Sequence, residues 1–224
     1  PFLWDLVHDR RILGPVEDLL GPDLVCWGSS FFAKAPGSAD RVPWHQDGTY
    51  WGLEEPAALT VWLAFTPSVR ENGCLRVVPG SHREAVGHRD AGDPDNMLPV
   101  GEEVAVDVDE GRARACVLAP GEMSIHHVLL VHGSEPNRSG DRRIGFALRY
   151  IPTRLAQTKT RDRAMLVRGR DAFGNFEHEP EPVADLDVRG VVGHGAHPDE
   201  SDGDADEKDS RGRIPYPIED DQCG

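Results

Sequence analysis

The sequence predicts an all-β domain, an antiparallel sandwich or barrel with a few flanking helices. Three observations support this prediction. Short apolar segments of strand length recur along the chain, turn residues separate them, and few helical patterns lie between them. Gly and Pro are plentiful, with 24 and 18 residues, as expected where many short strands are joined by turns.

The first 22 residues are the main exception, because they indicate helix followed by a turn. Apolar residues recur at helical spacing within 3–7 and again within 16–20, and Gly21-Pro22 would end the second segment. From Leu24 the pattern changes to strands. The candidate strands, in chain order, are 24–33, 59–65, 75–78, 104–108, 113–118, 123–131 and 143–151.

The end of the chain differs in composition from the rest. From about residue 155 the sequence is polar with isolated aromatic residues, so we expect a long closing segment. Residues 199–209 (DESDGDADEKD) are nearly all acidic or small, and such a composition does not bury enough apolar surface to fold alone. We therefore expect one domain over 1–198 and an acidic polar tail or loop over 199–224. The chain has no starting Met, which agrees with a domain trimmed at its front.

Charge excludes two classes of partner. The 224 residues include 24 basic and 39 acidic side chains, for a formal net charge of -15. A nucleic-acid-binding surface needs clustered Lys and Arg, and so does adhesion to an anionic membrane. No stretch is apolar enough to span a membrane, and the N-terminus lacks the layout of a signal peptide. We therefore expect neither nucleic acid nor a membrane as a partner.

Cysteine usage indicates a reducing compartment. The four cysteines are widely and irregularly spaced, and none forms a C-x-x-C pair: Cys26, Cys74, Cys116 and Cys223. Buried free thiols in the cytoplasm are the simplest interpretation.

His45-Gln46-Asp47 is the first element that carries chemistry. On an extended segment, residues two apart point to the same side, so His45 and Asp47 can aim an imidazole and a carboxylate at one point. His132, after the apolar run VLLV, is the best candidate for a third ligand. Two histidines and one carboxylate on one face of Fe(II) leave three open positions, which suit a bidentate co-substrate and O2. An H-x-D triplet alone is common in loops that bind no metal, so the interpretation depends on a second element.

That second element is the segment 132–143 (HGSEPNRSGDRR). Its turn-forming residues predict a tight turn that returns the chain antiparallel and brings Arg143 alongside His132. A guanidinium in that place can hold a dicarboxylate by a two-pronged contact, and Ser134 can add a hydroxyl donor. Position alone does not separate Arg142 from Arg143.

Taken together, these motifs resemble the phytanoyl-CoA dioxygenase (PhyH) family. The matching stretches are WHQDGTYW (44–51), ENGCLRVVPGSH (71–82) and HGSEPNRSGDRR (132–143). The resemblance runs from about Leu24 to Tyr150, over half the chain. It implies a double-stranded β-helix, a cupin-like jelly roll with the metal at one mouth.

The resemblance also implies roles for individual residues. His45, Asp47 and His132 would bind Fe(II). Arg143, eleven residues after the distal histidine, would bind 2-oxoglutarate together with Ser134, which decides between Arg143 and Arg142. Trp62 matches a tryptophan that helps to bind 2-oxoglutarate, although core packing explains a buried tryptophan equally well.

The substrate residues are less defined by the motifs. Tyr50 and Trp51 follow the H-x-D triplet closely and are candidates to line the substrate pocket, although packing explains them nearly as well. Gln46, between two ligands, is a further candidate. Strand alternation along 123–131 would place His126 on the side of His132. One interpretation of His126 is a contact to a metal ligand or to the substrate. We favour a packed, hydrogen-bonded histidine outside the metal shell.

The implied activity is a 2-oxoglutarate-dependent, non-haem iron dioxygenase. It would hydroxylate an unactivated C–H of a small metabolite or natural-product intermediate, with succinate and CO2 as co-products. Asp47 argues against halogenation, because halogenases of this superfamily replace that carboxylate by a small residue. Desaturation, epimerisation and ring formation stay open, since they need the same oxidant. Two alternatives belong to other classes: a non-catalytic jelly-roll binder of small molecules and a metal-dependent hydrolase.

Overall fold

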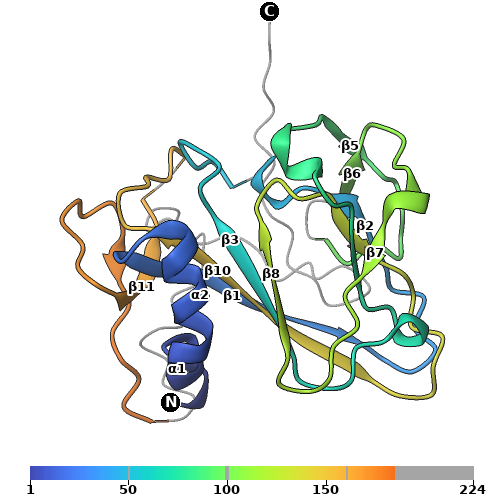
Figure 1. Cartoon of the computed structure of the whole chain (residues 1–224), viewed down its shortest axis with the longest axis horizontal. Helices are drawn as coiled ribbons and strands as arrows, with labels where there is room; N and C mark the ends of the chain where they lie inside the picture. Colours follow the sequence, from blue (N-terminus) through green and yellow to red (C-terminus); the bar gives the residue numbers. More distant parts are fainter. Residues whose placement is uncertain (50, 99–100, 160, 185–224) are drawn as a thin grey trace, which may run out of the picture.

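The chain begins with a helical pair, as its apolar spacing predicts. The computed structural model describes residues 1–49, 51–98, 101–159 and 161–184. Helix α1 (Phe2–Val7) leads directly into α2 (Arg10–Leu20), which begins where the Asp9 side chain accepts a hydrogen bond from the Arg11 backbone. Gly21, at φ 95°, follows the last helical residue. Both helices pack on the long strands at one end of the molecule (Figure 1).

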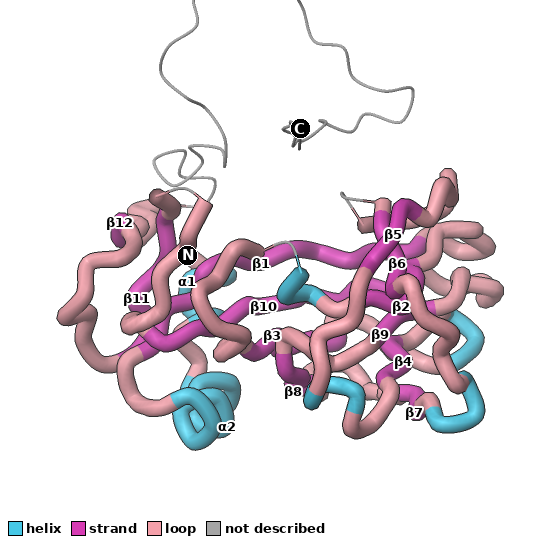
Figure 2. The backbone as a smooth tube through the Cα atoms, turned by 90° about the horizontal axis from the view of Figure 1, so that it is seen from above, coloured by secondary structure: helices cyan, strands magenta, loops and turns pink. Residues whose placement is uncertain are grey.

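A six-stranded sheet forms the body of the fold. Its strands are arranged in the order β12-β11-β1-β10-β3-β8. Their bounds are β1 (Leu24–Lys34), β3 (Leu59–Ala64), β8 (Met123–His127), β10 (Arg143–Pro152), β11 (Arg163–Arg168) and β12 (Glu177–His178). Neighbouring strands pair antiparallel, except that β11 and β12 are parallel. Figure 2 shows β1 and β10 running together from one side of the molecule to the other.

A smaller sheet lies over one end of these long strands. It has the order β2-β9-β4-β7, with β2 (Val42–His45), β9 (His132–Ser134), β4 (Leu75–Val77) and β7 (Arg114–Ala115). A separate antiparallel pair, β5 (His88–Asp90) and β6 (Glu102–Val104), lies beside it (Figure 2). The described residues thus form a mostly β fold of two sheets that do not close into a barrel. This confirms the predicted jelly-roll class.

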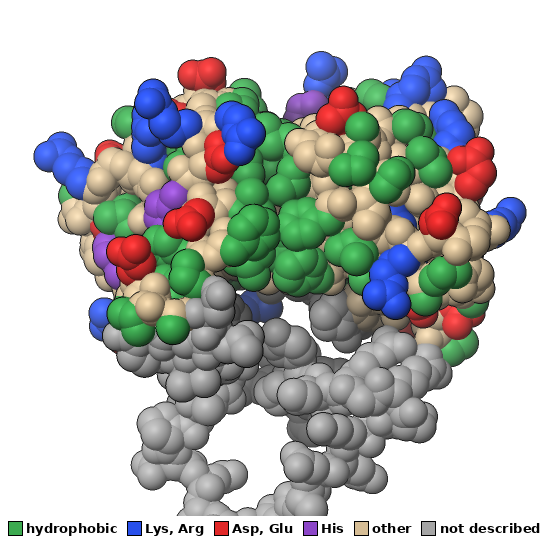
Figure 3. All heavy atoms as spheres, turned by 90° about the horizontal axis from the view of Figure 1, so that it is seen from below, with side chains coloured by type: hydrophobic (Ala, Val, Ile, Leu, Met, Phe, Trp, Pro, Cys, Tyr) green, Lys and Arg blue, Asp and Glu red, His purple; other side chains and the backbone are tan. Residues whose placement is uncertain are grey.

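The main apolar core lies between the helices and the large sheet. Val7, Leu13 and Val16 of the helices pack with residues of β1, β3 and β10, including Phe146 and Tyr150. Every residue of β3 is buried, as expected for a strand covered on both faces. On one side of the molecule an apolar area lies at the centre of the surface (Figure 3). Neither α-helix of the described residues is long and apolar enough to cross a membrane.

One predicted strand is wrong in a way that matters for the site. The apolar run 123–131 forms no single strand, because β8 ends at His127 and a turn follows, with the Leu130 N–H donating to the His127 carbonyl. The chain then enters β9 at His132, in the other sheet. Periodicity cannot distinguish a continuous strand from two short ones when the turn between them is apolar.

Other boundaries also differ from the sequence prediction. The expected strand 104–108 is wrong, because β6 covers Glu102–Val104, and β2 and β11 were not predicted. Among the described residues, Cys26 and Cys74 are buried free thiols and Cys116 is a half-buried one. Cys223 and the predicted tail 199–224 lie outside the described residues. The domain boundary at 198 and the cytoplasmic location stay predictions.

Candidate metal centre

Three predicted ligands converge between the two sheets. His45 ends β2 and His132 begins β9, and these two residues are paired across the strands. Asp47 begins a short 3-10 turn (Asp47–Thr49) rather than continuing the strand, so a turn and not strand alternation carries its carboxylate to the histidines. The Nε2 atoms of His45 and His132 lie 3.4 and 3.8 Å from Asp47 Oδ1. All three ligand atoms lie within 4.8 Å of one another, as a shared metal ion requires.

The backbone fixes which ring nitrogen of each histidine faces the centre. Nδ1 of His45 lies 2.9 Å from the Pro43 carbonyl, and Nδ1 of His132 lies 2.8 Å from the Leu130 carbonyl. A carbonyl only accepts hydrogen bonds, so each Nδ1 carries a proton and each Nε2 is the nitrogen that faces the centre. Such carbonyl contacts orient metal-binding imidazoles.

The charges at this centre suit a cation. Burial, followed by the neighbouring His45, lowers the pKa of His132 well below its ordinary value, so its imidazole is neutral. Burial alone would raise the pKa of Asp47, but the surrounding imidazoles outweigh it and lower that pKa, so the carboxylate stays ionised. Thr60 donates a 2.9 Å hydrogen bond to Asp47 Oδ2, which leaves Oδ1 facing the histidines. Two imidazole nitrogens and one carboxylate form a donor set that suits Fe(II) and leaves coordination positions open.

A cavity extends from the three ligands between the sheets. It has about 450 Å³ of empty space, including the part that opens to solvent. Its wall consists of Phe32, Val42, His45, Asp47, Thr60, Trp62, Leu75, His126, His132, Ser134, Arg143, Ala147 and Arg149. Both sheets contribute to this wall, so a bound molecule would be enclosed by the two of them.

Arg143 lies in this wall but not alongside His132. Strand β10 pairs with β1 and β3, whereas β9 pairs with β2 and β4, so the turn after β9 returns the chain into the opposite sheet. The predicted antiparallel pairing of these two segments is therefore wrong, although both side chains reach the same cavity. Arg143 is 1% exposed, and its Nε and Nη2 atoms have no hydrogen-bond partner among the described residues. Burial lowers its pKa to about 10.

Trp62 packs in a small core cluster, where it is 4% exposed, and also lines the cavity; a contact to 2-oxoglutarate stays a prediction. The Arg143 guanidinium lies 5.3 Å from the centre of its ring. Gly145 makes this arrangement possible, since a Cβ there would lie 1.9 Å from the ring of Trp62. The tryptophan thus occupies the space that a side chain at 145 would need.

The three predicted substrate residues lie in different settings. The Gln46 amide donates to the Glu84 and Leu129 carbonyls at 2.8 and 2.6 Å and accepts from the Val86 backbone at 2.9 Å. Gln46 does not belong to the cavity wall, so these contacts give it a structural role. Tyr50 lies outside the described residues.

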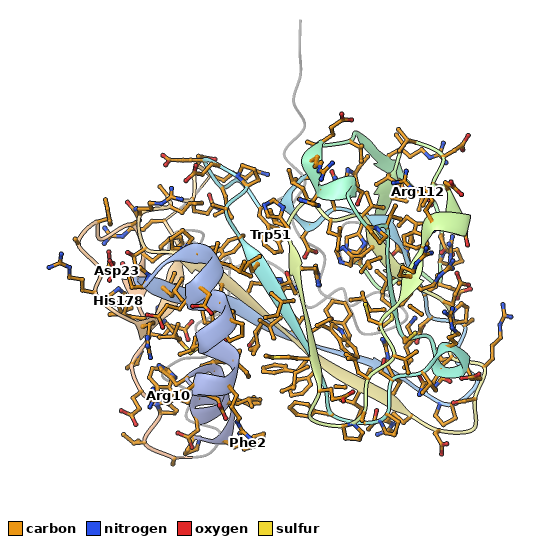
Figure 4. All side chains as sticks on the ribbon, in the orientation of Figure 1. Phe2, Arg10, Asp23, Trp51, Arg112 and His178 are labelled. Atoms are coloured by element: carbon orange, nitrogen blue, oxygen red, sulfur yellow. The ribbon has the colours of Figure 1, made fainter. Side chains whose placement is uncertain are left out.

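Trp51 does not belong to the cavity wall. Its ring meets Trp27 edge-on at 5.4 Å and lies 5.6 Å below the guanidinium of Arg149. Arg149 does line the cavity and also donates to Ser30 Oγ at 3.1 Å. In Figure 4 Trp51 lies between the helical end of the molecule and the small sheet. Trp51 thus supports a residue that faces the cavity.

His126 differs from the sequence interpretation. It is 5% exposed and lines the cavity, with Nε2 3.8 Å from Asp47 Oδ2, but neither ring nitrogen has a hydrogen-bond partner among the described residues. The expected hydrogen bonds are therefore wrong, although the ring is buried and lies outside the set of three ligands, as expected. It faces His132 from the opposite sheet, with ring centres 4.6 Å apart.

Sequence reasoning missed Lys34, the last residue of β1. Its side chain is completely buried and donates to Ser134 Oγ at 2.7 Å. Lys34 has the same strand parity as Phe32, a wall residue, which is the signal that could have placed it between the sheets.

Asn137 has a structural role within the segment 132–143, which was predicted only as a turn. Its amide is 1% exposed and donates to the Ala35 and Asp141 carbonyls at 2.9 and 2.7 Å. Its Oδ1 accepts from the backbone and the hydroxyl of Ser139. The amide thereby ties the turn to the end of β1, which sets where β10 begins.

Comparisons with known proteins agree with this geometry. The family model described as Phytanoyl-CoA dioxygenase (PhyH) matches residues 1–145. The chain is 30% identical over 139 residues to "Dioxygenase lolE1" of Epichloe uncinata, covering 62% of this chain and 50% of that protein. It is 32% identical over 135 residues to "Phytanoyl-CoA dioxygenase, peroxisomal" of Homo sapiens, covering 58% and 40%. The chain thus spans about half the length of the curated relatives it matches, or less.

Solved structures with a similar fold are described as a non-heme monooxygenase or as a complex with Fe(II) and alpha-ketoglutarate. The apo structure of a protein described as "non-heme monooxygenase; ThoJ apo" superposes with a TM-score of 0.73 at 39% identity, covering 83% of this chain and 68% of that one. A structure described as "CytC3 with Fe(II) and alpha-ketoglutarate" superposes with a TM-score of 0.59 at 28% identity, covering 79% and 68%. With the fold, the three converging ligands and a family match over residues 1–145, the chain belongs to the phytanoyl-CoA dioxygenase (PhyH) family.

Proposed function

We propose that this protein is an Fe(II)- and 2-oxoglutarate-dependent dioxygenase that hydroxylates an unactivated C–H of a small metabolite or natural-product intermediate. One observation carries the proposal. A cavity that holds two imidazoles and a carboxylate also holds a buried guanidinium, two of whose nitrogens have no hydrogen-bond partner among the described residues. A metal site alone does not need that guanidinium, whereas a metal-bound dicarboxylate does.

Each residue has a defined part in this proposal. His45, Asp47 and His132 hold the iron, and Thr60 keeps the Asp47 carboxylate turned toward it. Arg143 and Ser134 bind the far carboxylate of 2-oxoglutarate, with Trp62 beside it. When bound, iron, 2-oxoglutarate and O2 supply the oxidant and give succinate and CO2 as co-products. The protein itself orients the two bound molecules and encloses them between its sheets.

The test is an anaerobic titration of the metal-free protein with Fe(II) and 2-oxoglutarate. A chelated keto acid gives a weak visible charge-transfer band, and succinate release in air then measures turnover. We expect the band in the wild type and a weaker band in Arg143→Ala. If iron-loaded, folded protein gave no band, the oxygenase proposal would be wrong and a non-catalytic binder would take its place.

A second outcome has support from one relative. A solved structure described as a non-heme alpha ketoglutarate dependent carbocyclase, SnoK, superposes with a TM-score of 0.56 at 26% identity. The same oxidant would then serve ring formation, desaturation or epimerisation instead of hydroxylation. The product mass distinguishes them: hydroxylation adds one oxygen, desaturation and ring formation remove two hydrogens, and epimerisation leaves the mass unchanged.

A further inference from the structure

Lys34 joins the two sheets at the end of the cavity where Arg143 lies. It ends β1 of the large sheet and is paired across the strands with Arg143. Its ammonium reaches the small sheet, where it lies 3.3 Å from the Ser134 carbonyl, 2.7 Å from Ser134 Oγ and 2.5 Å from the Glu135 carbonyl. An ammonium has three hydrogens to donate, and these three acceptors use all of them.

These contacts determine what the Ser134 hydroxyl can do. A protonated lysine has no lone pair, so Ser134 Oγ can only accept from it. The hydroxyl hydrogen of Ser134 must therefore point elsewhere, and it has no acceptor among the described residues. Ser134 lines the cavity. Its hydroxyl is thus available as a donor to a molecule bound there.

The surroundings of Lys34 disfavour its protonated form. Burial and then the positive charge of Arg143 on β10 lower its pKa to about 7. Glu135 after β9, Asp40 after β1 and Cys74 before β4 act in the opposite direction without compensating. A carboxylate bound beside Arg143 and Ser134 would add a further negative charge next to these two buried basic side chains.

We propose that Lys34 is a positioning residue that holds the Ser134 hydroxyl as a donor toward the far carboxylate of 2-oxoglutarate, and that the affinity for 2-oxoglutarate therefore depends on the protonation of Lys34. The inference rests on the proposed function. When Lys34 loses its proton to solvent, the neutral amine gains a lone pair and can accept the Ser134 hydroxyl hydrogen, which turns that hydrogen away from the cavity. Binding of the carboxylate reverses this change and takes one proton from solvent.

The decisive measurement is anaerobic calorimetry of the Fe(II)-loaded protein titrated with 2-oxoglutarate between pH 6.5 and 8.5. Two buffers with different ionisation heats report the number of protons taken up. We expect little uptake at pH 6.5 and nearly one proton at pH 8.5. We also expect the affinity to fall by up to about tenfold per pH unit above about pH 7.

Variants assign the effect to Lys34. Lys34→Met should bind 2-oxoglutarate about tenfold more weakly at pH 6.5 and show neither proton uptake nor pH dependence. Ser134→Ala should weaken binding by a similar factor, and the double variant should be no weaker than either single one, because both changes remove the same contact. Lys159→Met, which changes an exposed lysine, is the matched control and should behave as the wild type.

The outcomes separate this inference from the proposed function. If the wild type bound no 2-oxoglutarate at any pH, the proposed function itself would fail. Binding with no proton uptake and a flat pH profile would overturn the role of Lys34 alone. The wild-type proton count also decides the matter if Lys34→Met does not fold, since it needs no variant.

Discussion

The two ends of the cavity are built on opposite principles. At the metal end, each histidine has one ring nitrogen fixed by a backbone carbonyl, and Thr60 holds the carboxylate of Asp47. At the other end, Arg143 is buried, and its Nε and Nη2 atoms have no hydrogen-bond partner among the described residues. Burial and then the charge of Arg143 lower the pKa of Lys34 beside it. The metal end is therefore arranged in advance, whereas the other end holds two buried basic side chains.

This difference has an energetic meaning. A buried donor without a partner costs about 1–3 kcal/mol, and more when it is charged. The protein keeps this cost in the absence of ligand, so a carboxylate that enters gains binding energy by removing it. The metal end is pre-organised, and the other end holds buried basic side chains. Mutations at the two ends should therefore affect ligand affinity and stability differently.

The largest effect should come from Asp47→Ala. This change removes the only carboxylate of the three ligands, so we expect Fe(II) affinity to fall by more than the roughly 10–100-fold that loss of a supporting contact costs. Calorimetric titration with Fe(II) under nitrogen measures it, with the exposed Asp95→Ala as control. Metal affinity equal to that of the wild type would show that the centre lies elsewhere.

Arg143→Met should have two effects of opposite sign. We expect 2-oxoglutarate to bind at least about thirtyfold more weakly, because contacts to charged groups contribute about 1.5–3 kcal/mol each. The ligand-free protein should become more stable, since an unpaired buried charge is gone, and its melting temperature should rise by a few degrees. A thermal scan without ligand checks the second effect. A lower melting temperature would contradict the view that the buried charge of Arg143 destabilises the ligand-free protein.

Thr60→Val should affect only the metal end. The substitution keeps the shape of the side chain but removes the hydrogen bond to Asp47 Oδ2. We expect Fe(II) to bind about 10–100-fold more weakly, while 2-oxoglutarate affinity at saturating iron stays within about threefold. Parallel titrations with each ligand test this, and equal losses for both would mean that the two ends are not independent.

The smallest effect should come from His126→Phe. Neither nitrogen of this buried ring has a hydrogen-bond partner among the described residues, so an apolar ring of similar size should leave stability unchanged or raise it by about 1–2 kcal/mol. Urea unfolding of the metal-free protein measures the change. A clear loss of stability would mean that the imidazole has a structural partner in solution.

Sequence reasoning placed the strands well where apolar runs are bounded by turn residues. The prediction of 143–151 is close to β10, and that of 59–65 is close to β3. It failed at 123–131, because the turn after β8 consists of Val and Leu and carries no Gly or Pro. It also missed β2, which is preceded by the turn-rich segment 35–41 and has only four residues.

The candidate site shows the same limit. Residue types and spacing brought His45, Asp47 and His132 together as a hypothesis, and the structure places them in contact distance of one metal. The structural basis of this convergence differs from the predicted one. Strand alternation was expected to bring the ligands together, whereas a 3-10 turn at Asp47 and a change of sheet before His132 do so. Lys34 and His126 were missed or misread because their roles depend on which side chains lie opposite, in the other sheet.

The close fit of Trp62 against Gly145 constrains which substitutions this protein can accept during evolution. A methyl group at position 145 would overlap the tryptophan ring, so Gly145→Ala is forbidden while Trp62 is present. Once position 62 holds a smaller residue, the same substitution becomes harmless or fills the gap. The order of the two mutations therefore decides whether a side chain can be introduced at position 145, and such a change, natural or engineered, has to begin at position 62.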